Sequence, residues 1–303
     1  MTGDVTILLG ALTLDLAFGE PPARFHPVVW MGRLNAALRR RAPSGNRPAF
    51  LWGAFMAALG PVAFGGLAWL ALDHTGGLAR TLIAIFLLKS SFAIRALAHA
   101  GLGVARPLAA GDLDGARTGL RSLVSRETSA LPAPLVAAAA VESLAENASD
   151  SIVAPLFFFA IAGVPGAIAY RAVNTLDATI GYRGPLEWLG KAAARLDDVA
   201  NLVPARVTAL LLTLAAPVGG GSTRRALAVW VRDRKLTESP NAGHPMAAMA
   251  GALAVELEKR SHYRLGAGLS PPSARDIGRA IRVVLGATAL AAALVLLTRL
   301  RAT

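Results

Sequence analysis

The sequence predicts an all-α fold, namely a polytopic integral membrane bundle of helices with polar cytoplasmic loops and a candidate re-entrant hairpin. Of its 303 residues, 54% are hydrophobic and only 17% are charged, and the mean hydropathy is +0.50. A soluble domain of this length is less apolar, so the composition indicates a lipid bilayer as the solvent. Several apolar runs are also long enough to cross it, since a spanning helix needs roughly 20 apolar residues.

Six segments are predicted to lie in the membrane, within a single membrane-embedded helical domain of residues 1–303. They are residues 5–18, 50–72, 78–98, 152–170, 202–218 and 281–300. The second has no charge, and the third carries Lys89 and Arg95 near one end, from which long basic side chains can reach the headgroups. Residues 131–173 join an acidic, alanine-rich helix to an apolar run broken at Pro155 and Pro165, which is typical of a polar-lined hairpin.

The basic excess fits membrane topology better than nucleic-acid binding. Lys and Arg number 31 against 19 Asp and Glu, a formal net charge of +12, and the surplus lies in loops between apolar runs. Because cytoplasmic loops collect Lys and Arg, residues 19–49 and 219–280 are expected on the cytoplasmic side of a cell inner membrane. An even number of crossings must then separate these loops, so one doubtful segment is re-entrant or does not cross. No nucleic-acid partner is expected, and the absence of cysteine excludes disulfides and thiolate metal sites.

Four clusters of polar residues stand out, because carboxylates inside apolar helices are costly to keep in a bilayer. The first contains Asp15, Glu20, Arg24 and His26, where a glycine and three prolines end a helix and present acid, base and imidazole in one loop. A catalytic role for Glu20 and a solvated ion pair of Glu20 with Arg24 are both open on the sequence.

Glu142, Glu146 and Asp150 form the second cluster, with a spacing of i, i+4, i+8 that places them on one face of a helix. Such a row of like charges repels itself unless a cation lies among them. Mg²⁺ prefers oxygen ligands and would meet that need, as would Arg126 or Arg171. The alternative is a solvent-facing stripe, which the apolar run directly after it disfavours.

The third cluster contains Arg171, Asn174 and Asp177, of which the last two share a helix face, and is followed by Asp197 and Asp198. These adjacent aspartates have a plain alternative, because carboxylates are also favoured at a helix start.

Residues 239–245, Ser-Pro-Asn-Ala-Gly-His-Pro, form the fourth cluster. Pro240 and Gly243 predict a turn, and a helix that begins near Pro245 would offer free N–H groups to an anion such as phosphate, close to Asn241. A loop-to-helix junction without a ligand is the alternative.

Familiar catalytic motifs are excluded. Residues 184–191 resemble a phosphate-binding loop, but five residues rather than four separate Gly184 from Gly190, and Ala192 stands where Ser or Thr would ligate magnesium. There is no Gly-x-Ser-x-Gly nucleophile elbow, and the five histidines show no His-x-x-x-His spacing. No known motif therefore locates a nucleotide site.

Short polar motifs follow one another in order between residues 10 and 265. They are Leu14-Asp15-Leu16, Gly19-Glu20-Pro21-Pro22, His26-Pro27, Ser125-Arg126-Glu127-Thr128, Glu142-Ser143, Glu146-Asn147, Asp150, Asn174-Thr175-Leu176-Asp177, Ser239-Pro240-Asn241-Ala242-Gly243 and Pro245. Any one of them is weak, but the ordered set on a chain with several spans is specific. It resembles the CobD/CbiB family of adenosylcobinamide-phosphate synthases.

The resemblance implies an amide-forming step of cobalamin biosynthesis. A corrinoid, adenosylcobyric acid, would be joined to (R)-1-aminopropan-2-ol or its O-phosphate to give adenosylcobinamide or its phosphate. Family members are described as membrane-bound ligases that use ATP. A carboxylate is a poor electrophile for an amine, so activation, most simply as an acyl phosphate, must precede attack. Membrane lipid and other cobalamin-biosynthesis enzymes are the expected partners.

The candidate residues receive roles as hypotheses. Three carboxylates are assigned to Mg²⁺ beside the nucleotide phosphates, namely Glu142, Glu146 and Asp150. Two arginines are expected to neutralise phosphate charge, namely Arg126 and Arg171. The remaining candidates for ATP or phosphate contacts are Asn174, Asn241 and Gly243. The base that deprotonates the attacking amine is sought among Glu20, Glu127 and Asp177.

Two other functions stay open. Distant relatives of the AmpE type are membrane proteins associated with β-lactamase regulation, but the dense polar motifs argue against a purely regulatory role. A membrane transporter would also use intramembrane carboxylates. It predicts inverted repeats and broken helices in matching halves, of which the sequence gives no convincing sign.

Overall fold

The computed structural model describes residues 2–301, which are mostly helical with one short two-stranded sheet. The predicted all-α membrane fold is confirmed. The chain divides into two compact units: the first contains residues 1–93, 154–201 and 292–303, and the second contains residues 94–153 and 202–291. The single membrane-embedded domain stays a prediction, and residues 1, 302 and 303 of it lie outside the described part.

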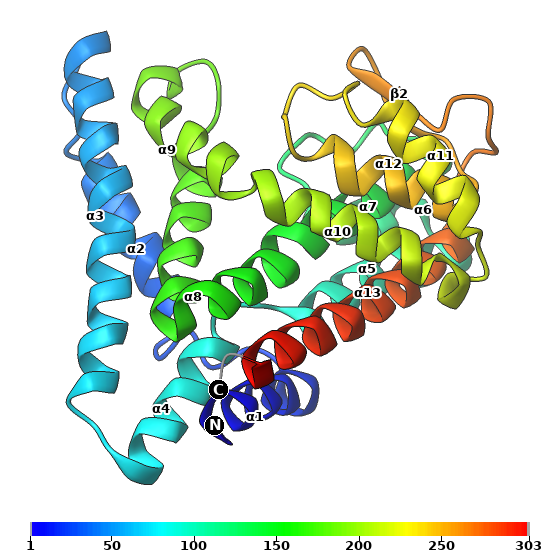
Figure 1. Cartoon of the computed structure of the whole chain (residues 1–303). Helices are drawn as coiled ribbons and strands as arrows, with labels where there is room; N and C mark the ends of the chain where they lie inside the picture. The colour runs from blue at the N-terminus through cyan, green and yellow to red at the C-terminus, as the bar shows by residue number, and fades with distance from the viewer. Residues whose placement is uncertain (1, 302–303) are drawn as a thin grey trace. The chain divides into compact units, whose positions relative to one another are not determined.

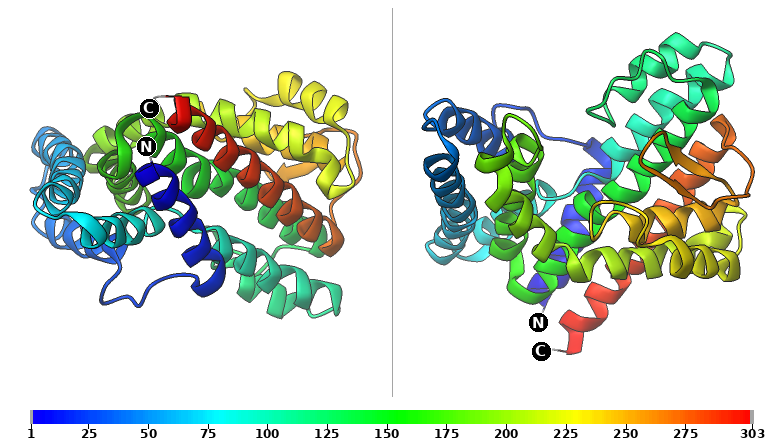
Figure 2. Two further views of the ribbon diagram at one scale, coloured as in Figure 1. Left: turned by 60° about the horizontal axis from the view of Figure 1, so that its bottom comes forward. Right: turned by 90° about the horizontal axis from the view of Figure 1, so that it is seen from above.

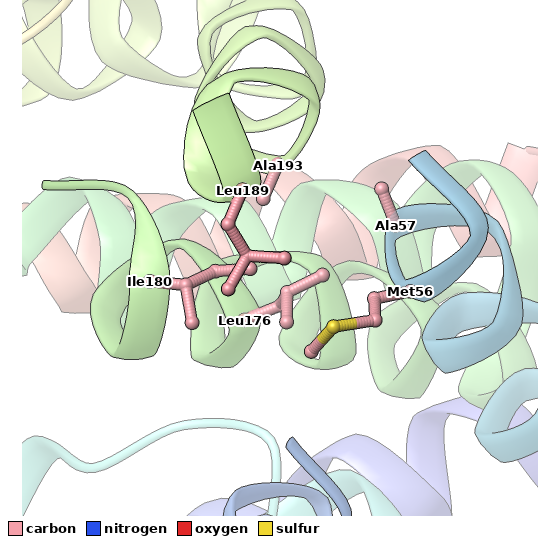
Figure 3. Packing of buried hydrophobic residues seen from close by; sticks show 6 residues of the cluster. All are labelled: Met56, Ala57, Leu176, Ile180, Leu189 and Ala193. Atoms are coloured by element: carbon pink, nitrogen blue, oxygen red, sulfur yellow. The ribbon is translucent and has the colours of Figure 1, made fainter. Parts of the chain in front are cut away.

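The first unit is built from helices far apart in sequence (Figure 1). They are α1 (Thr2–Phe18), α2 (Pro27–Arg39), α3 (Asn46–Asp73), α4 (Gly77–Lys89), α8 (Ala154–Ile180), α9 (Glu187–Ala200) and the end of α13 (Ala274–Arg301). Helix α3 packs against α8 and α9, and Figure 3 shows their shared core of Met56, Ala57, Leu176, Ile180, Leu189 and Ala193. Gly53 permits this approach, because a Cβ there would lie 1.9 Å from the carbonyl oxygen of Leu189. Small residues let membrane helices pack closely where lipid offers no hydrophobic driving force.

The second unit surrounds α12, whose 11 residues are all buried. Its elements are α5 (Ile94–Ala109), α6 (Leu113–Leu120), α7 (Ala133–Ala148), the π-helix η1 (Ser149–Val153), α10 (Leu202–Ala215), the 3₁₀-helix η2 (Ala216–Gly219), α11 (Thr223–Asp233), α12 (Gly243–Leu253), β1 (Leu257–Lys259), β2 (Tyr263–Leu265) and the first part of α13. Helix α12 packs against α7, α10 and α11, and the two views of Figure 2 show α11 along its side. Strands β1 and β2 form an antiparallel hairpin in which Lys259 pairs with Tyr263.

Among the described residues, five helical segments are long and apolar enough to cross a membrane. They are Asn46–Asp73, Gly77–Ala109, Ala133–Ile180, Leu202–Gly219 and Ala274–Leu300. These segments contain five of the six predicted spans. Helix α1 is helical as predicted, but its 17 residues leave it outside this set. A crossing at residues 5–18 therefore stays a prediction.

The predicted span at residues 78–98 is interrupted near its middle. Helix α4 ends at Lys89 and α5 begins at Ile94. At the break, the Ser90 hydroxyl donates to the carbonyl oxygen of Phe86 at 2.8 Å, and Ser91 donates to Leu88 at 2.6 Å. Serine hydroxyls that bond to the preceding turn compete with the backbone ladder, which favours a helix end here.

The predicted break in the apolar run 152–170 lies at Ala162 and Gly163. Gly163 has φ +64°, a conformation that residues with a Cβ rarely adopt, and Ala162 is also non-helical. Pro165 follows in the first turn after the break, where a proline is tolerated because its N–H has no partner within the new helix. Pro155, by contrast, does not break the segment: it is the second residue of α8, directly after the π-helix η1. The re-entrant path of this segment stays a prediction.

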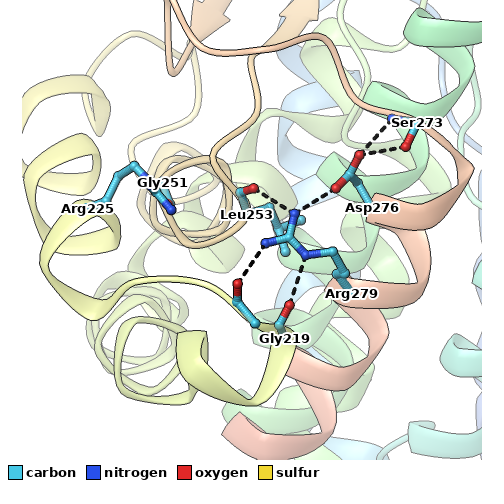
Figure 4. A network of polar contacts seen from close by, with 8 residues as sticks. Gly219, Arg225, Gly251, Leu253, Ser273, Asp276 and Arg279 are labelled. Carbon is cyan, nitrogen blue, oxygen red and sulfur yellow. Dashed lines mark hydrogen bonds and ion pairs between the residues drawn. The ribbon is translucent and has the colours of Figure 1, made fainter.

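Arg279 of α13 ties the ends of two other helical segments together (Figure 4). Its guanidinium donates to the carbonyl oxygens of Gly219 at 2.9 Å, Gly220 at 3.3 Å and Leu253 at 2.9 Å. Asp276, one turn earlier, accepts from the same guanidinium at 2.8 Å. A cation at the C-terminal carbonyls of η2 and α12 satisfies groups that have no partner within those helices.

Replacing Arg279 by alanine is expected to destabilise the second unit by about 2–3 kcal/mol, since hydrogen bonds from a charged group are worth more than neutral ones. Thermal unfolding of the detergent-solubilised protein measures this loss. Arg282→Ala, on the same helix and exposed, is the matched control and should unfold like the wild type. Equal melting temperatures for Arg279→Ala and Arg282→Ala would contradict the bracing role.

Candidate functional site

The first predicted cluster forms in the first unit, around a lysine that the sequence did not assign to it. Lys89, at the end of α4, lies 3.3 Å from Oδ1 of Asp15 and 2.9 Å from Oε2 of Glu20. Asp15 is completely buried and the Lys89 side chain is 4% exposed. Nδ1 of His26 accepts the N–H of Val28 at the start of α2, which leaves Nε2 to donate to Glu20 at 2.7 Å. The cluster therefore joins α1, α2 and α4.

Glu20 is expected to make the stability of the protein depend on pH. Burial opposes its ionisation, but hydrogen bonds from His26 and Lys89 outweigh that effect and hold the pKa of Glu20 below its usual range. A carboxyl group with a lowered pKa stabilises the folded state above its unfolded pKa, and this contribution disappears as the pH falls through the folded value.

The melting temperature should therefore drop more steeply between about pH 5 and pH 3 in the wild type than in Glu20→Gln. Thermal unfolding in detergent across that pH range is the measurement. Parallel curves for the two proteins would contradict the assignment.

A second polar network in the first unit converges on Asp197 of α9. Arg171 donates to Oδ1 of Asn174 at 3.0 Å, and the Asn174 amide donates to Asp197 at 3.4 Å. From the other side, the Tyr170 hydroxyl donates to Asn201 at 2.9 Å, and Asn201 donates to Asp197 at 2.9 Å. Burial raises the pKa of Asp197 despite these hydrogen bonds. The sequence left Asp197 as either a cluster member or a helix-start residue. The structure shows it as the common acceptor in the last turn of α9, so the helix-start interpretation is wrong.

Asp177 lies on α8, one turn after Asn174, and is half-buried. Its Oδ1 lies so close to Gly181 that a Cβ there would be only 1.9 Å away. The lack of a side chain at Gly181 therefore leaves room for the carboxylate of Asp177 at the end of α8. The catalytic role of Asp177 stays a prediction.

The Glu142 cluster forms in the second unit, where α7 meets the β-hairpin. The Glu142 side chain is 7% exposed, and its Oε2 lies 3.4 Å from a guanidinium nitrogen of Arg126. Glu146 and Lys259 also act on it electrostatically. Burial, followed by the carboxylates of Glu142 and Glu146, raises the pKa of Tyr263 well above its usual range, so its hydroxyl stays protonated.

Asp150 does not complete a three-carboxylate site. Within residues 2–301, no three acidic or histidine side chains come together as a ligand group for an ion. Residues eight apart rise about 12 Å along an α-helix, too far for both carboxylates to bind one ion through bonds of about 2 Å. Asp150 also belongs to the π-helix, which changes the helical register. Glu142 and Glu146 fit the one or two carboxylates by which proteins hold Mg²⁺ beside substrate phosphates.

Glu127 orders its own loop. Its Oε1 accepts the backbone N–H groups of Thr128 at 2.9 Å and Ser129 at 3.0 Å. These hydrogen bonds lower the pKa of Glu127. A base with a lowered pKa is poorly matched to removing a proton at neutral pH, which favours a structural role for Glu127 beside Arg126.

The predicted turn at residues 239–245 leads into α12 as expected. The Ser239 hydroxyl accepts the N–H groups of Asn241 and Ala242, both at 3.2 Å. Arg206 of α10 donates to Oδ1 of Asn241 at 3.2 Å. Gly243 is required by packing, because a Cβ there would lie 2.4 Å from the carbonyl oxygen of Arg234.

His244 is neutral at physiological pH. Its burial, with Arg206 and Arg234 nearby, lowers the pKa of His244 to about 4. Trp230 donates to Nδ1 at 3.1 Å, so the proton of the neutral ring lies on Nε2. The turn therefore presents a neutral donor and cationic arginines, a set that suits an anion.

The candidate residues are thus divided between the two units. The first holds Glu20, Arg171, Asn174 and Asp177. The second holds Arg126, Glu127, Glu142, Glu146, Asp150, Asn241 and Gly243.

Comparison with known proteins supports the family that the polar motifs resemble. The family model described as CobD/Cbib protein matches residues 8–284. The chain belongs to the CobD/CbiB family. A relative in Dehalococcoides mccartyi, named cobalamin biosynthesis protein CobD, is 45% identical over 88% of this chain and 87% of its own length. No solved structure matches the chain.

Two further relatives extend the family across distant organisms. A protein of the same name in Rhodobacter capsulatus is 45% identical over 83% of this chain and 81% of its own length. A probable cobalamin biosynthesis protein CobD in Methanothermobacter thermautotrophicus is 40% identical, with 87% of both chains covered. The resemblance inferred from the motifs is therefore confirmed, and the chain is a member of a family of cobalamin biosynthesis proteins.

Sequence reasoning missed five residues of these clusters or gave them no role: Lys89, Asp197, Arg206, Lys259 and Tyr263. A lysine in an apolar run was itself a signal, because a buried charge needs a partner, but it was read as a residue that reaches the headgroups. Lys259 and Tyr263 carried no local signal. They lie on a short hairpin whose position beside α7 depends on the tertiary fold.

Proposed function

We propose that this protein catalyses ATP-dependent amide ligation in cobalamin biosynthesis, joining adenosylcobyric acid to (R)-1-aminopropan-2-ol or its O-phosphate. Family membership supplies the pathway. The observation that supports ligase chemistry is the Glu142 cluster. A buried carboxylate faces Arg126, with Lys259 and Glu146 nearby, which is a charge set suited to phosphate groups and a divalent ion.

The reaction needs activation of the corrinoid carboxylate. ATP would supply a phosphoryl group, so that the carboxylate oxygen forms a bond to phosphorus while ADP leaves. The amine nitrogen then attacks the acyl carbon, phosphate departs with the C–O bond electrons, and the proton on nitrogen passes to a base. Atoms and charges balance without a redox partner.

The residues of the second unit are assigned to phosphate chemistry. Glu142 and Glu146 would hold Mg²⁺, and Arg126 and Lys259 would neutralise the charge that builds up on the transferred phosphoryl group. The turn at Asn241, with the arginines beside it, would bind a phosphate of ATP or of the aminopropanol.

The residues of the first unit are assigned to proton transfer and anion binding. Asp177 is the candidate for the base, since Glu127 is engaged by its own loop and Glu20 by His26 and Lys89. Arg171, oriented through Asn174 by the half-buried Asp197, would contact an anionic group of a substrate. The corrinoid, its amine co-substrate and membrane lipid are the expected partners.

The location follows from the same proposal. The multi-pass chain would lie in a cell inner membrane with residues 19–49 and 219–280 in the cytoplasm, where ATP and other cobalamin-biosynthesis enzymes are available.

A purified-protein assay tests the function directly. The protein in detergent is mixed with adenosylcobyric acid, ATP and Mg²⁺, with aminopropanol or its phosphate, and the corrinoid mass is followed by chromatography. Product formed only when amine and ATP are both present would support the ligase and identify the preferred amine. No product from folded protein with authentic substrates would contradict the proposal. That result would favour an AmpE-like regulator or a transporter, whose activity needs a gradient that detergent removes.

A further inference from the structure

Helix α11 carries an exposed apolar face in addition to its buried one. Its inward side chains, Ala226, Val229 and Asp233, are buried. On the opposite face, Leu227 is 48% exposed and Val231 is 57% exposed. These two residues are four apart and therefore neighbours on the helix surface.

The orientation of α11 is set by polar contacts on its inner side. Nε of Arg225 donates to the carbonyl oxygen of Gly251 at 3.1 Å, and Trp230 donates to His244. Asp233 accepts the backbone N–H of Gly266 at 2.6 Å. Because these contacts face α12 and the hairpin, the apolar outer face cannot turn inward to cover itself.

The position of α11 places it close to where the chain leaves the bilayer. The candidate span Leu202–Gly219 ends only three residues before Ser222, the N-cap of α11. Arg279 holds Gly219 near the start of α13, the beginning of another candidate span. Helix α11 therefore begins just after the end of one span, whose last residue, Gly219, is hydrogen-bonded to Arg279 near the start of another.

Basic side chains frame the apolar face. Arg224, Arg232 and Lys235 are exposed, and Leu236, just past the helix end, is 51% exposed. A helix with exposed leucine and valine bounded by Arg and Lys has the composition of an interfacial helix. Anionic lipid headgroups complement its charge, and they attract each nearby Lys or Arg.

We propose that the outer face of α11 lies in the membrane interface, with Leu227 and Val231 against the acyl boundary and Arg224 and Lys235 against anionic phospholipid headgroups. This contact holds α11 at the bilayer surface. It is independent of the ligase reaction and stands or falls without it.

Single cysteines test the proposal cleanly, because the chain has none of its own. Leu227→Cys, Val231→Cys and the control Asp114→Cys are labelled with a fluorophore and reconstituted in vesicles of phosphatidylcholine alone or with phosphatidylglycerol. Asp114 lies on α6 of the same unit with a side chain 91% exposed. Quenching is measured with nitroxide-bearing lipid and with aqueous iodide.

The labels at residues 227 and 231 should be quenched by nitroxide lipid and protected from iodide, while the label at residue 114 shows the reverse. Phosphatidylglycerol should strengthen the lipid contact. Removing the framing charges with Arg224→Gln or Lys235→Gln should lower the ratio of lipid-exposed to water-exposed label by about fivefold per charge in those vesicles.

Three results would overturn the proposal. Iodide quenching at residues 227 and 231 equal to that at residue 114 would place the face in water. Protection from both quenchers would show that protein covers it. Lipid quenching that is unaffected by phosphatidylglycerol and by the two charge substitutions would remove the anionic headgroup from the assignment.

Discussion

Lys89→Met is expected to destabilise the protein by about 3–5 kcal/mol, the loss typical when one partner of a buried ion pair is removed. Lys89 is the cation shared by Asp15 and Glu20, and Asp15 has no exposed surface at all. Without the lysine, the Asp15 carboxylate stays in a medium that solvates it poorly. The fall is measured as a lower melting temperature and a smaller folded peak in detergent.

A double variant separates charge from packing. Asp15→Asn combined with Lys89→Met removes the uncompensated charge, so it should recover a large part of the lost stability. Lys191→Met is the matched control, because Lys191 is an exposed lysine of the same unit that contacts only the ring of Trp188 in the described contacts. A Lys89→Met protein that unfolds at the wild-type temperature would show that the ion pair is not needed.

Glu142→Gln is expected to lower the rate of amide formation by about 100-fold or more, the effect of removing one well-placed electrostatic group from an active site. Glutamine keeps the shape of the side chain but removes the charge that faces Arg126 and Lys259. The rate is measured in the purified-protein assay with saturating ATP. For Glu146→Ala, one turn along the same helix, we expect complete loss of activity.

The control for Glu142 lies on the β-hairpin. Glu258 forms an ion pair with Arg264, which is more than half exposed, so Glu258→Gln should leave the rate unchanged. Each variant is also compared with the wild type by thermal unfolding. Near-normal turnover of folded Glu142→Gln and Glu146→Ala would remove the magnesium role from both residues.

Much of the fold was predictable because hydropathy acts locally. Residues 50–72 and 281–300 read as spans from their length alone, and the structure places each in a long apolar helix. The interruption after Lys89 was harder to see. It depends on serine hydroxyls that bond to the preceding turn and on an ion pair with Asp15, a partner 74 residues earlier in the sequence, and hydropathy averages over such contacts.

The candidate site divides in the same way. Glu20 with His26, and Arg126 with Glu142, were named from motifs, and each pair is in contact in the structure. Glu142 and Glu146 lie one turn apart on α7 as predicted, but Asp150 lies in the π-helix η1, which changes the helical register. The inference that all three could meet one ion neglected the rise of the helix. For Asp197 the sequence left two alternatives open, a cluster member or a helix-start carboxylate. The packing of α8 against α9, which lets Asn174 join Asn201 as a donor to it, decided between them.

The sequence by itself determined the solvent and the family of this protein. Both follow from information carried by neighbouring residues: the free energy of transferring an apolar run into lipid, and short motifs in a fixed order. Only the tertiary structure decided which charges share a buried site. Lys89 reaches Asp15, and Lys259 and Tyr263 reach Glu142, because helix and hairpin packing brings distant backbone segments together. The strength of such contacts depends on distance and burial, which local sequence does not encode.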